Sequence, residues 1–549
     1  MSTPAQHLPA SDAAADATPL RFVTAASLFD GHDAAINIMR RIIQAQGAEV
    51  IHLGHNRSVE DVVRAALQED ADAIALSSYQ GGHVEYFKYM VDMLKERGAG
   101  HIRVFGGGGG TITPEEIAEL QDYGVERIYH PNDGMHLGLT AMIEDVMRRT
   151  RAGREAREAS APVKPAQAEV GDEISIGAVM SALENRSYAD SELSRLRKEW
   201  QMAGQHTPVL GLTGTGGAGK SSVVDELLLR FLHAFPEMHI AVLAVDPTRR
   251  RSGGALLGDR IRMNSLRSPR VYMRSMATRR AHAATSEVLT DSIAFLKSRD
   301  YDLVIVETAG IGQSDSEIVD LVDFPMYVMT SDYGAASQLE KIDMIDFAEL
   351  IVLNKYDRRG AEDALRDVRK QWKRNRTAFD LADDQVPVYP TIASQFNDPG
   401  VTWMFANLCR LLREKLGEGS DAPVLGSAHC DFAPDLDTTI KEPRATVLIP
   451  GQRVRYLAEI AEQGRGINTD IEKQAEAASK AQHVHQVLAE LDDAKLPKAL
   501  DLYSASDVSD SAGAQVHRDS DNEGSYWETE DGTVGVDRSM LILRQRYNE

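Results

Sequence analysis

The sequence has 549 residues, enough for roughly three or four domains, and 43% of them are hydrophobic, which suffices for ordinary buried cores. Its formal net charge of −23 disfavours nucleic acids and anionic membrane surfaces as partners, because phosphate groups select basic protein surfaces. Only two cysteines and no run of about 18 consecutive apolar residues occur, which disfavours a disulfide framework, a Cys-rich zinc site and a transmembrane helix, and fits a reducing cytoplasm.

The N-terminal third of the chain has the pattern of a parallel α/β domain. Residues 1–19 are rich in Ala, Ser, Pro and Asp without a basic segment, and we interpret them as a disordered tail and not as a signal peptide. Residues 20–150 then alternate short apolar strands with helices, which predicts a flavodoxin-like (Rossmann-type) doubly wound sheet that binds its ligand at the carboxyl ends of the strands. The strands are predicted at RFVTAASL, EVIHLG, AIALSS, HIRVFGGG and ERIYH, and the helices over 33–46, 58–69, 83–97 and 114–121.

The rest of the chain divides into three further segments. Residues 151–206 are a charged, Ala-rich linker and a helical spacer, with a helix over 176–200. A second α/β alternation over 207–417 predicts a second parallel-sheet domain. Residues 418–549 form a mostly helical and irregular connector, helical over 453–493 and weakly ordered over the Ser-, Asp- and Gly-rich stretch 504–536.

A phosphate-binding loop opens the second α/β domain. The segment VLGLTGTGGAGKSS follows a predicted strand and precedes a predicted helix, which is the context of a P-loop. Backbone N–H groups of the glycine-rich turn and of the helix N-terminus hold phosphates in such a loop, the lysine reaches the β- and γ-phosphates, and the serine binds Mg²⁺. The predicted nucleotide contacts here are Gly214, Gly216, Gly217, Ala218, Gly219, Lys220, Ser221 and Ser222.

Two later strand ends add a metal position and a base-recognition position. YDLVIVETAG ends in Glu307, Thr308 and Gly310, where a carboxylate can hold Mg²⁺ and the glycine amide can sense the γ-phosphate. IVLNKYD supplies the third motif, whose carboxylate can accept hydrogen bonds from both N1–H and N2–H₂ of guanine. Adenine offers no such pair of donors, so the motif favours GTP over ATP. The base-recognition residues are Asn354, Lys355 and Asp357.

The segment VDPTRRRSGGALLGDRIRM lies between these motifs. Asp246 ends a predicted strand, and Asp259, Arg260 and Arg262 follow a Gly-rich stretch. The two acids can complete a Mg²⁺ shell and Arg262 can meet phosphate or base, although the residues by themselves fit a solvated charged loop as well.

These four segments together resemble the G-protein chaperones of adenosylcobalamin-dependent acyl-CoA mutases. The resemblance implies slow GTP hydrolysis that gates cofactor loading, with Lys220, Asp246 and Glu307 as catalytic residues. The segment SDYGAASQLEKIDMIDFAEL departs from the corresponding switch of that family, so the resemblance does not say how hydrolysis is coupled to loading. The magnesium positions that it implies are Ser221, Asp246, Asp259, Glu307 and Thr308.

A second candidate site follows the first predicted strand, at Asp30-Gly31-His32. An Asp near a metal-ligating His can accept the second ring N–H and fix the tautomer. LSSYQGGH and VFGGGGGTITPEE place Ser, Tyr and a glycine run at neighbouring strand ends, where a flat group can lie against backbone. FMN is an alternative ligand for this fold, but it needs no axial histidine. We interpret His52, His55 and His83 as ordinary polar positions.

The three segments resemble the cobalamin-binding domain of base-off, His-on mutases, with the pattern DxHxxG…SxL…GG. The resemblance implies that His32 ligates the cobalt of adenosylcobalamin and that Asp30 tunes it. Ala35 and Tyr79 depart from the Gly and Leu of the pattern, and we expect both to lie in the groove for the nucleotide tail. The tail-groove residues are Ser77, Tyr79, Gly107, Gly108 and Gly109.

Both modules in this order resemble the fused isobutyryl-CoA mutases. The resemblance implies a radical 1,2-rearrangement of isobutyryl-CoA to n-butyryl-CoA, a homodimer, and a cobalamin adenosyltransferase as a further partner. A substrate-binding barrel needs about 250 residues, more than follow residue 417, so we expect it in a longer chain or in a separate subunit. A cobalamin-sensing GTP switch that is not a mutase, and a GTPase whose first domain is only a docking module, are the alternatives.

Overall fold

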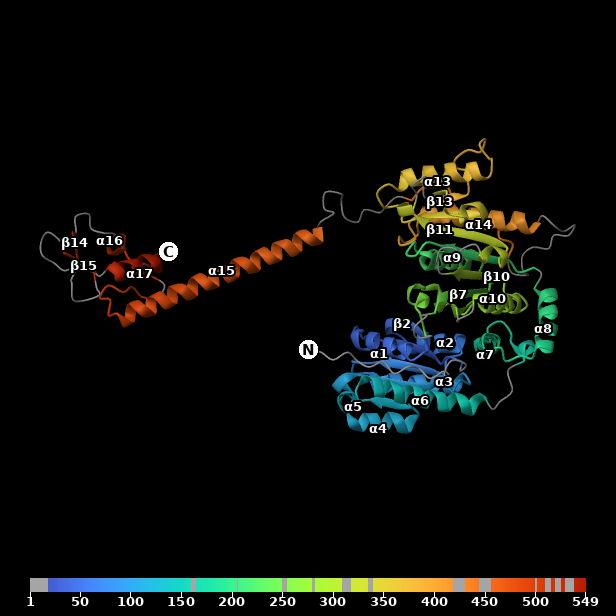
Figure 1. The fold of residues 1–549 in the computed structure, drawn as a ribbon, viewed down its shortest axis with the longest axis horizontal. Helices are drawn as coiled ribbons and strands as arrows, with labels where there is room; N and C mark the ends of the chain where they lie inside the picture. Colours follow the sequence, from blue (N-terminus) through green and yellow to red (C-terminus); the bar gives the residue numbers. More distant parts are fainter. Residues whose placement is uncertain are drawn as a thin grey trace. The chain divides into compact units, whose positions relative to one another are not determined.

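The computed structural model divides into two compact units, Met1–Ala445 and Thr446–Glu549, whose elements are labelled in Figure 1. It describes residues 18–158, 164–204, 206–248, 254–278, 282–308, 317–333, 339–417, 430–443, 456–498, 501–508, 515–518, 525–528 and 538–549. Most of the predicted N-terminal tail and Gly310 lie outside these ranges.

The first α/β domain matches the predicted doubly wound fold. Its sheet, as far as the chain is described, has six strands in the order β5-β4-β3-β1-β2-β8, so the first five have the flavodoxin-like order 2-1-3-4-5. The elements are β1 (Arg21–Ser27), α1 (Ala34–Ala45), β2 (Glu49–Arg57), α2 (Val59–Gln68), β3 (Ala73–Ser77), α3 (His83–Glu96), β4 (Arg103–Gly107), α4 (Pro114–Tyr123), β5 (Arg127–Tyr129), α5 (Pro131–Leu137) and α6 (Leu139–Glu158).

Helices cover both faces of this sheet, and local sequence fixes where they begin. One apolar core contains side chains from α2, α3 and α4, and another on the opposite face contains Ile43 of α1 and Met142 of α6. Ser58 caps α2 by accepting a hydrogen bond from the Asp61 amide, and Thr113 with Glu116 forms a capping box at α4. The strand ends therefore stand on a packed base, with their carboxyl edge available for ligands.

The sixth strand of the first sheet comes from the second domain. Residues Ala255–Leu257 form β8, which pairs parallel with β2 in the register Glu49↔Ala255 and Ile51↔Leu257. These residues belong to the Gly-rich segment that the sequence indicated to be a loop. The predicted five-stranded first sheet was therefore incomplete.

The spacer is two helices and not the single helix predicted over 176–200. The helices are α7 (Glu173–Glu184) and α8 (Asp190–Ala203). Arg186 between them has a φ of 52°, in the left-handed region, so the chain turns there. The prediction was wrong because the charged, helix-favouring composition hides a short turn.

The second α/β domain is the predicted P-loop domain. Among the described residues its sheet has seven parallel strands in the order β13-β12-β11-β6-β10-β7-β9. Apolar cores on its two faces include side chains of α9 and α14 on one side and of α10 and α13 on the other. The elements are β6 (Val209–Gly214), α9 (Lys220–Ala234), β7 (Ile240–Pro247), the short 3₁₀ helices η4 (Asp259–Arg262) and η5 (Ser265–Arg267), β9 (Val271–Thr278), α10 (His282–Lys297), β10 (Leu303–Thr308), β11 (Phe324–Thr330), α12 (Met344–Phe347), β12 (Leu350–Asn354), α13 (Ala361–Asn375), β13 (Val388–Thr391) and α14 (Pro399–Gly417).

The C-terminal unit contains the predicted long helix. Its elements are α15 (Tyr456–Glu490), α16 (Ala505–Val508), β14 (Gln515–Arg518), β15 (Ser525–Glu528) and α17 (Arg538–Asn548). A small core of Leu488, Tyr503 and Tyr547 joins α15 to α17, with a buried ion pair between Asp493 and Arg544. The short elements α16, β14 and β15 lie within the stretch predicted to be weakly ordered. Where the structure is described, no helix is both long and apolar enough to cross a membrane.

Candidate functional site

The turn after β1 holds His32 by two contacts with one carboxylate, which accepts from the His32 amide and lies beside the ring. Oδ1 of Asp30 accepts from the His32 amide at 2.8 Å and lies 2.9 Å from His32 Nδ1. Oδ2 accepts from the Tyr79 amide at 2.7 Å, which ties this turn to the end of β3. The Asp30 side chain is fully buried, whereas that of His32 is 75% exposed. With Nδ1 engaged by Asp30, Nε2 is the ring nitrogen that can bind a metal.

Sequence reasoning missed the residues that shape this turn. Phe29 has a φ of 62°, and its amide donates to Oδ1 of Asn56 at 2.8 Å, from the end of β2. Asn56 also has a positive φ, of 55°. Two strained residues from different strand ends therefore brace the segment just before Asp30, and nothing in their sequence spacing indicated this pairing.

An apolar cavity lies beside the His32 turn, between the ends of β3 and β4 and the helices α1 and α6. Its volume is about 370 Å³. Ala35, one of the two residues that depart from the family pattern, lines it. The side-chain oxygen of Ser77 is buried and has no hydrogen-bond partner among the described residues. An apolar slot with one unsatisfied hydroxyl suits a flat heteroaromatic group that carries a polar atom. The predicted tail-groove residues that line the cavity are Ser77, Tyr79, Gly107, Gly108 and Gly109.

The glycine run at the end of β4 is needed by the protein's own packing. A Cβ on Gly108 would lie 2.0 Å from the Ser78 carbonyl oxygen, and one on Gly109 would lie 2.5 Å from the Tyr79 ring. A Cβ on Gly107 would meet only an ordinary contact, at 3.5 Å from the Tyr129 carbonyl oxygen. The sequence interpretation assigned these glycines to a bound ligand. In the structure they also let neighbouring strand ends approach each other.

The P-loop runs from the end of β6 into α9. Gly217 and Gly219 have positive φ, and Gly219 precedes the first residue of α9. A Cβ on Gly214 would lie 2.0 Å from the Val328 carbonyl oxygen, whereas a Cβ on Gly216 would have no atom within 4 Å. The turn therefore brings backbone amides to a helix N-terminus, the arrangement that binds phosphate. Ala218 is buried within the turn, and Ser222 lies in the first turn of α9.

The Lys220 ammonium group lies over the loop, donating to the carbonyl oxygens of Gly214 at 3.0 Å and Thr215 at 3.4 Å. This position lets the side chain reach phosphates held by the same turn.

Carboxylates from two segments meet at Ser221. Its Oγ donates to Glu307 at 2.8 Å and to Asp259 at 3.4 Å, and Thr308 follows at the end of β10. Burial, together with the negative charge of Asp259, raises the pKa of both Asp246 and Glu307. Such crowded acids favour a bound cation. Over the described ranges, however, no three His, Cys, Asp or Glu side chains are arranged to hold a metal alone. The donor set fits Mg²⁺ that also takes phosphate oxygens from a nucleotide.

The base-recognition motif is connected to the P-loop. Asn354 is buried, and its amide donates to the Ala218 carbonyl oxygen at 2.8 Å while its Oδ1 accepts from the Ala393 amide at 3.0 Å. Lys355 donates from Nζ to the Gly217 carbonyl oxygen at 2.7 Å. Asp357 is exposed in the turn after β12, where it is available to a base. Asn354 and Lys355 thus donate hydrogen bonds to carbonyl oxygens of the P-loop.

Arg262 is exposed at the end of η4, and its positive charge opposes the rise in the pKa of Glu307. Its contact with phosphate or base stays a prediction.

Comparisons with known proteins match both domains. Residues 20–133 match the B12 binding domain family, and residues 177–407 match the family described as methylmalonyl Co-A mutase-associated GTPase MeaB. These ranges contain the His32 turn and the P-loop site respectively.

Longer relatives contain both regions within one match. A fused isobutyryl-CoA mutase from Geobacillus kaustophilus is 50% identical over 469 residues, which are 84% of this chain and 42% of that protein. Another from Cupriavidus metallidurans is 52% identical over 484 residues, covering 88% of this chain and 43% of the relative. The chain spans less than half the length of these relatives. Over the matched residues the chain is similar to the fused isobutyryl-CoA mutases, and it combines a match to the B12 binding domain family with a match to the MeaB GTPase family.

Proposed function

We propose that this chain is the cobalamin-carrying and GTP-hydrolysing part of an acyl-CoA mutase that converts isobutyryl-CoA to n-butyryl-CoA. The observation that carries the proposal is the Asp30–His32 pair beside an apolar cavity, on the same chain as a P-loop with its acidic cluster. The relatives' names supply the reaction and the acyl-CoA.

The cobalamin-binding role belongs to residues at the carboxyl edge of the first sheet. Adenosylcobalamin, when bound, supplies a Co–C bond whose homolysis starts radical chemistry. His32 would hold the cobalt through Nε2, and Asp30 keeps the imidazole in one tautomer and orientation. The cavity accepts the displaced nucleotide tail, with Ser77 giving a hydrogen bond to it.

The GTPase role belongs to the second domain. Lys220 moves from its carbonyl contacts onto the β- and γ-phosphates, and Ser221 binds Mg²⁺ with help from Asp246, Asp259, Glu307 and Thr308. Asp357 selects guanine, and Arg262 approaches the phosphates or the base. We propose that hydrolysis of GTP by these groups gates the loading of adenosylcobalamin onto His32.

The acyl-CoA site is proposed to lie in a substrate-binding barrel, either further along a longer chain or on a separate subunit. A homodimer and a cobalamin adenosyltransferase that delivers the cofactor complete the proposed assembly. Turnover of isobutyryl-CoA by this chain alone would contradict the proposed division of labour.

A spectroscopic titration tests the cobalamin half. Adenosylcobalamin is added to the purified chain, to His32→Ala and to His55→Ala, a control that changes an exposed histidine near the end of β2. We expect the base-off, His-on absorption spectrum with the unchanged chain and with His55→Ala, and its loss with His32→Ala, since only His32 is paired with Asp30. Failure of the unchanged chain to alter the cobalamin spectrum would refute the proposal and leave a GTPase with a docking domain.

A further inference from the structure

One short segment of the GTPase domain is built into the sheet of the cobalamin-binding domain. The chain leaves β7, forms β8 on the edge of the first sheet, continues through η4 and η5, and returns to β9 of the second sheet. The Ala255 amide donates to the Ala48 carbonyl oxygen at 3.2 Å, which anchors the start of β8. Residues 255–267 are therefore held by both domains.

Two consecutive residues of η4 contact different domains. The Asp259 carboxylate lies 3.4 Å from Ser221 Oγ, in the nucleotide site. The next side chain, Arg260, is buried and turns toward the cobalamin-binding domain. Its Nε donates to Glu69 at 2.7 Å, and its terminal nitrogen donates to the Gln68 side chain at 2.9 Å. Because Arg260 and Asp259 are adjacent in η4, the Arg260 contacts hold the backbone next to Asp259.

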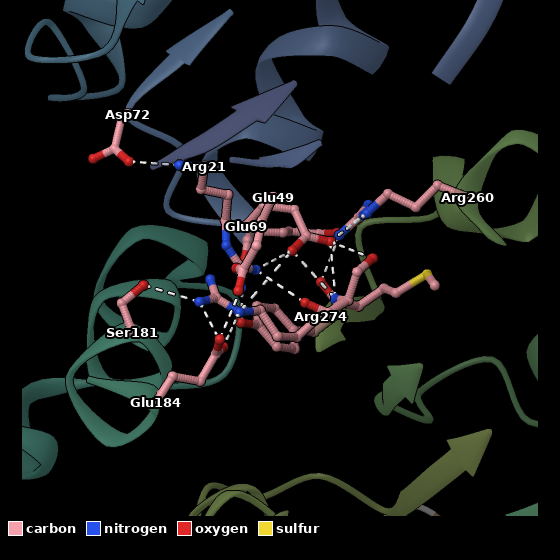
Figure 2. A network of polar contacts seen from close by, with 12 residues as sticks. Arg21, Glu49, Glu69, Asp72, Ser181, Glu184, Arg260 and Arg274 are labelled. Atoms are coloured by element: carbon pink, nitrogen blue, oxygen red, sulfur yellow. Dashed lines mark hydrogen bonds and ion pairs between the residues drawn. The ribbon is translucent and has the colours of Figure 1, made fainter. Parts of the chain in front are cut away.

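Glu69 lies at the centre of this contact, directly after the last residue of α2 (Figure 2). Its side chain has no exposed surface, and it accepts from Arg21 at 2.8 Å and from the Ser275 amide and hydroxyl at 3.0 and 2.9 Å. The surrounding arginines lower the pKa of Glu69 against the effect of burial. Figure 2 shows Arg21, Arg260 and Arg274 converging on this carboxylate from different elements.

Further contacts from β2 and α2 hold the same segment. Arg57 donates to the Ile261 carbonyl oxygen at 3.1 Å, and the Ile261 side chain packs so closely on Gly54 that a Cβ there would lie 2.6 Å from it. Arg64 donates to the Leu266 carbonyl oxygen at 3.0 Å. The first domain therefore fixes the backbone on either side of Asp259.

We propose that Glu69, a residue of the cobalamin-binding domain, is a positioning residue for GTP hydrolysis. Through Arg260 it fixes η4 and so holds the Asp259 carboxylate at Ser221, where Mg²⁺ is proposed to bind. This inference rests on the proposed GTPase function and adds to it that the nucleotide site is completed by the neighbouring domain. Residues that orient a metal-site carboxylate typically change metal affinity more than they change chemistry at saturating metal.

The test measures GTP hydrolysis by the full chain as a function of Mg²⁺ concentration in Arg260→Met, Glu69→Gln and the double variant. We expect the apparent KM for Mg²⁺ to rise about tenfold or more in Arg260→Met, with a smaller rise in Glu69→Gln, which keeps an acceptor oxygen. The kcat at saturating Mg²⁺ should stay within about threefold, because the phosphate-binding groups are untouched. The double variant should be no worse than Arg260→Met, since the two residues act through one contact.

Glu173→Gln is the matched control. Glu173 of α7 accepts from Arg64 at 2.7 Å and from Gln68 at 2.7 Å in the same interface, and it reaches Arg260 only through Gln68. Its Mg²⁺ dependence should match that of the unchanged chain. Far-UV circular dichroism shows whether each variant is folded. If Arg260→Met does not fold, Arg260→Lys takes its place, alone and combined with Glu69→Gln.

The possible results distinguish a failure of the positioning role from a failure of the proposed GTPase function. No Mg²⁺-dependent GTP hydrolysis by the unchanged chain would refute the proposed GTPase. Hydrolysis by the unchanged chain with identical Mg²⁺ dependence in Arg260→Met and Glu69→Gln would overturn only the positioning role. An equal rise in Glu173→Gln would also overturn it, because general loosening of the interface would then explain the effect.

Discussion

At the scale of single residues, the histidines that the sequence analysis distinguished lie in different environments. His32 is largely exposed and engages a buried carboxylate, whereas His52 on β2 is 4% exposed and its Nδ1 lies 3.0 Å from the Thr24 hydroxyl. The D-x-H spacing predicted the Asp30–His32 contact because both residues belong to one turn. It could not predict that the Tyr79 amide occupies the second oxygen of Asp30, since that contact spans two strands.

The buried His52 predicts a pH-dependent loss of stability. Burial, with the positive charge of Arg40, lowers the pKa of His52 to about 4. The folded protein therefore binds the proton less readily than the unfolded chain, whose histidine titrates near pH 6.5. Stability is unaffected above that pH and falls as the pH drops toward 4, by about 2 kcal/mol between pH 7 and pH 5.

Urea unfolding at pH 7 and pH 5 measures this loss. The variant His52→Asn keeps an acceptor near Thr24 but cannot titrate in this range, so its midpoint should fall less between the two pH values than that of the unchanged chain. Parallel pH dependence in the two proteins would show that His52 contributes nothing to it.

At the scale of elements, periodicity predicted the five strands and helices α1 to α4 of the first domain and the α/β alternation of the second. It did not predict α5 or α6, and the end of α6 falls in the predicted linker. Strands and helices of the first domain begin and end within a few residues of their predicted limits, because each buries a continuous apolar run or one apolar stripe. The strand β8 was missed because three residues in a Gly-rich charged segment carry no local strand pattern. Their partner β2 lies about 200 residues earlier in the chain, as the Glu49↔Ala255 pair shows.

The glycine run after β4 is expected not to tolerate a side chain at Gly108. Gly108→Ala would place a Cβ 2.0 Å from the Ser78 carbonyl oxygen, a contact with backbone that no rotamer relieves. We expect the cobalamin-binding domain to lose about 1–3 kcal/mol of stability, and the cavity beside Ser77 to bind cobalamin more weakly. Thermal unfolding and a cobalamin titration measure both effects.

Gly110→Ala is the control for this substitution, because a Cβ there has no atom within 4 Å. It should leave both quantities unchanged. Equal destabilisation by the two substitutions would mean that backbone freedom, and not the close approach to Ser78, is what the run provides.

At the scale of the whole molecule, the two α/β domains are joined by the strand β8, which the second domain contributes to the first sheet, and by one buried ionic cluster. Three features could be predicted because each is a short segment that contains all the residues of its motif. They are the P-loop, the acidic strand ends and the guanine motif. The Glu69–Arg260 contact could not be predicted, because its residues are 191 positions apart and no sequence motif contains both of them. Sequence motifs thus predicted a ligand for each domain, and the structure adds a physical link between the first domain and the nucleotide site.

The axial ligand of cobalt is the most direct test of the account. The purified chain, labelled uniformly with ¹⁵N, is loaded with cob(II)alamin, and its electron paramagnetic resonance spectrum is compared with that of the unlabelled protein. If His32 binds cobalt through Nε2, each cobalt line is split into a triplet by ¹⁴N and into a doublet by ¹⁵N, and His32→Ala loses the splitting. A triplet that persists in the labelled protein would show that the cofactor's own base stays on the metal, which would contradict the proposed role of His32.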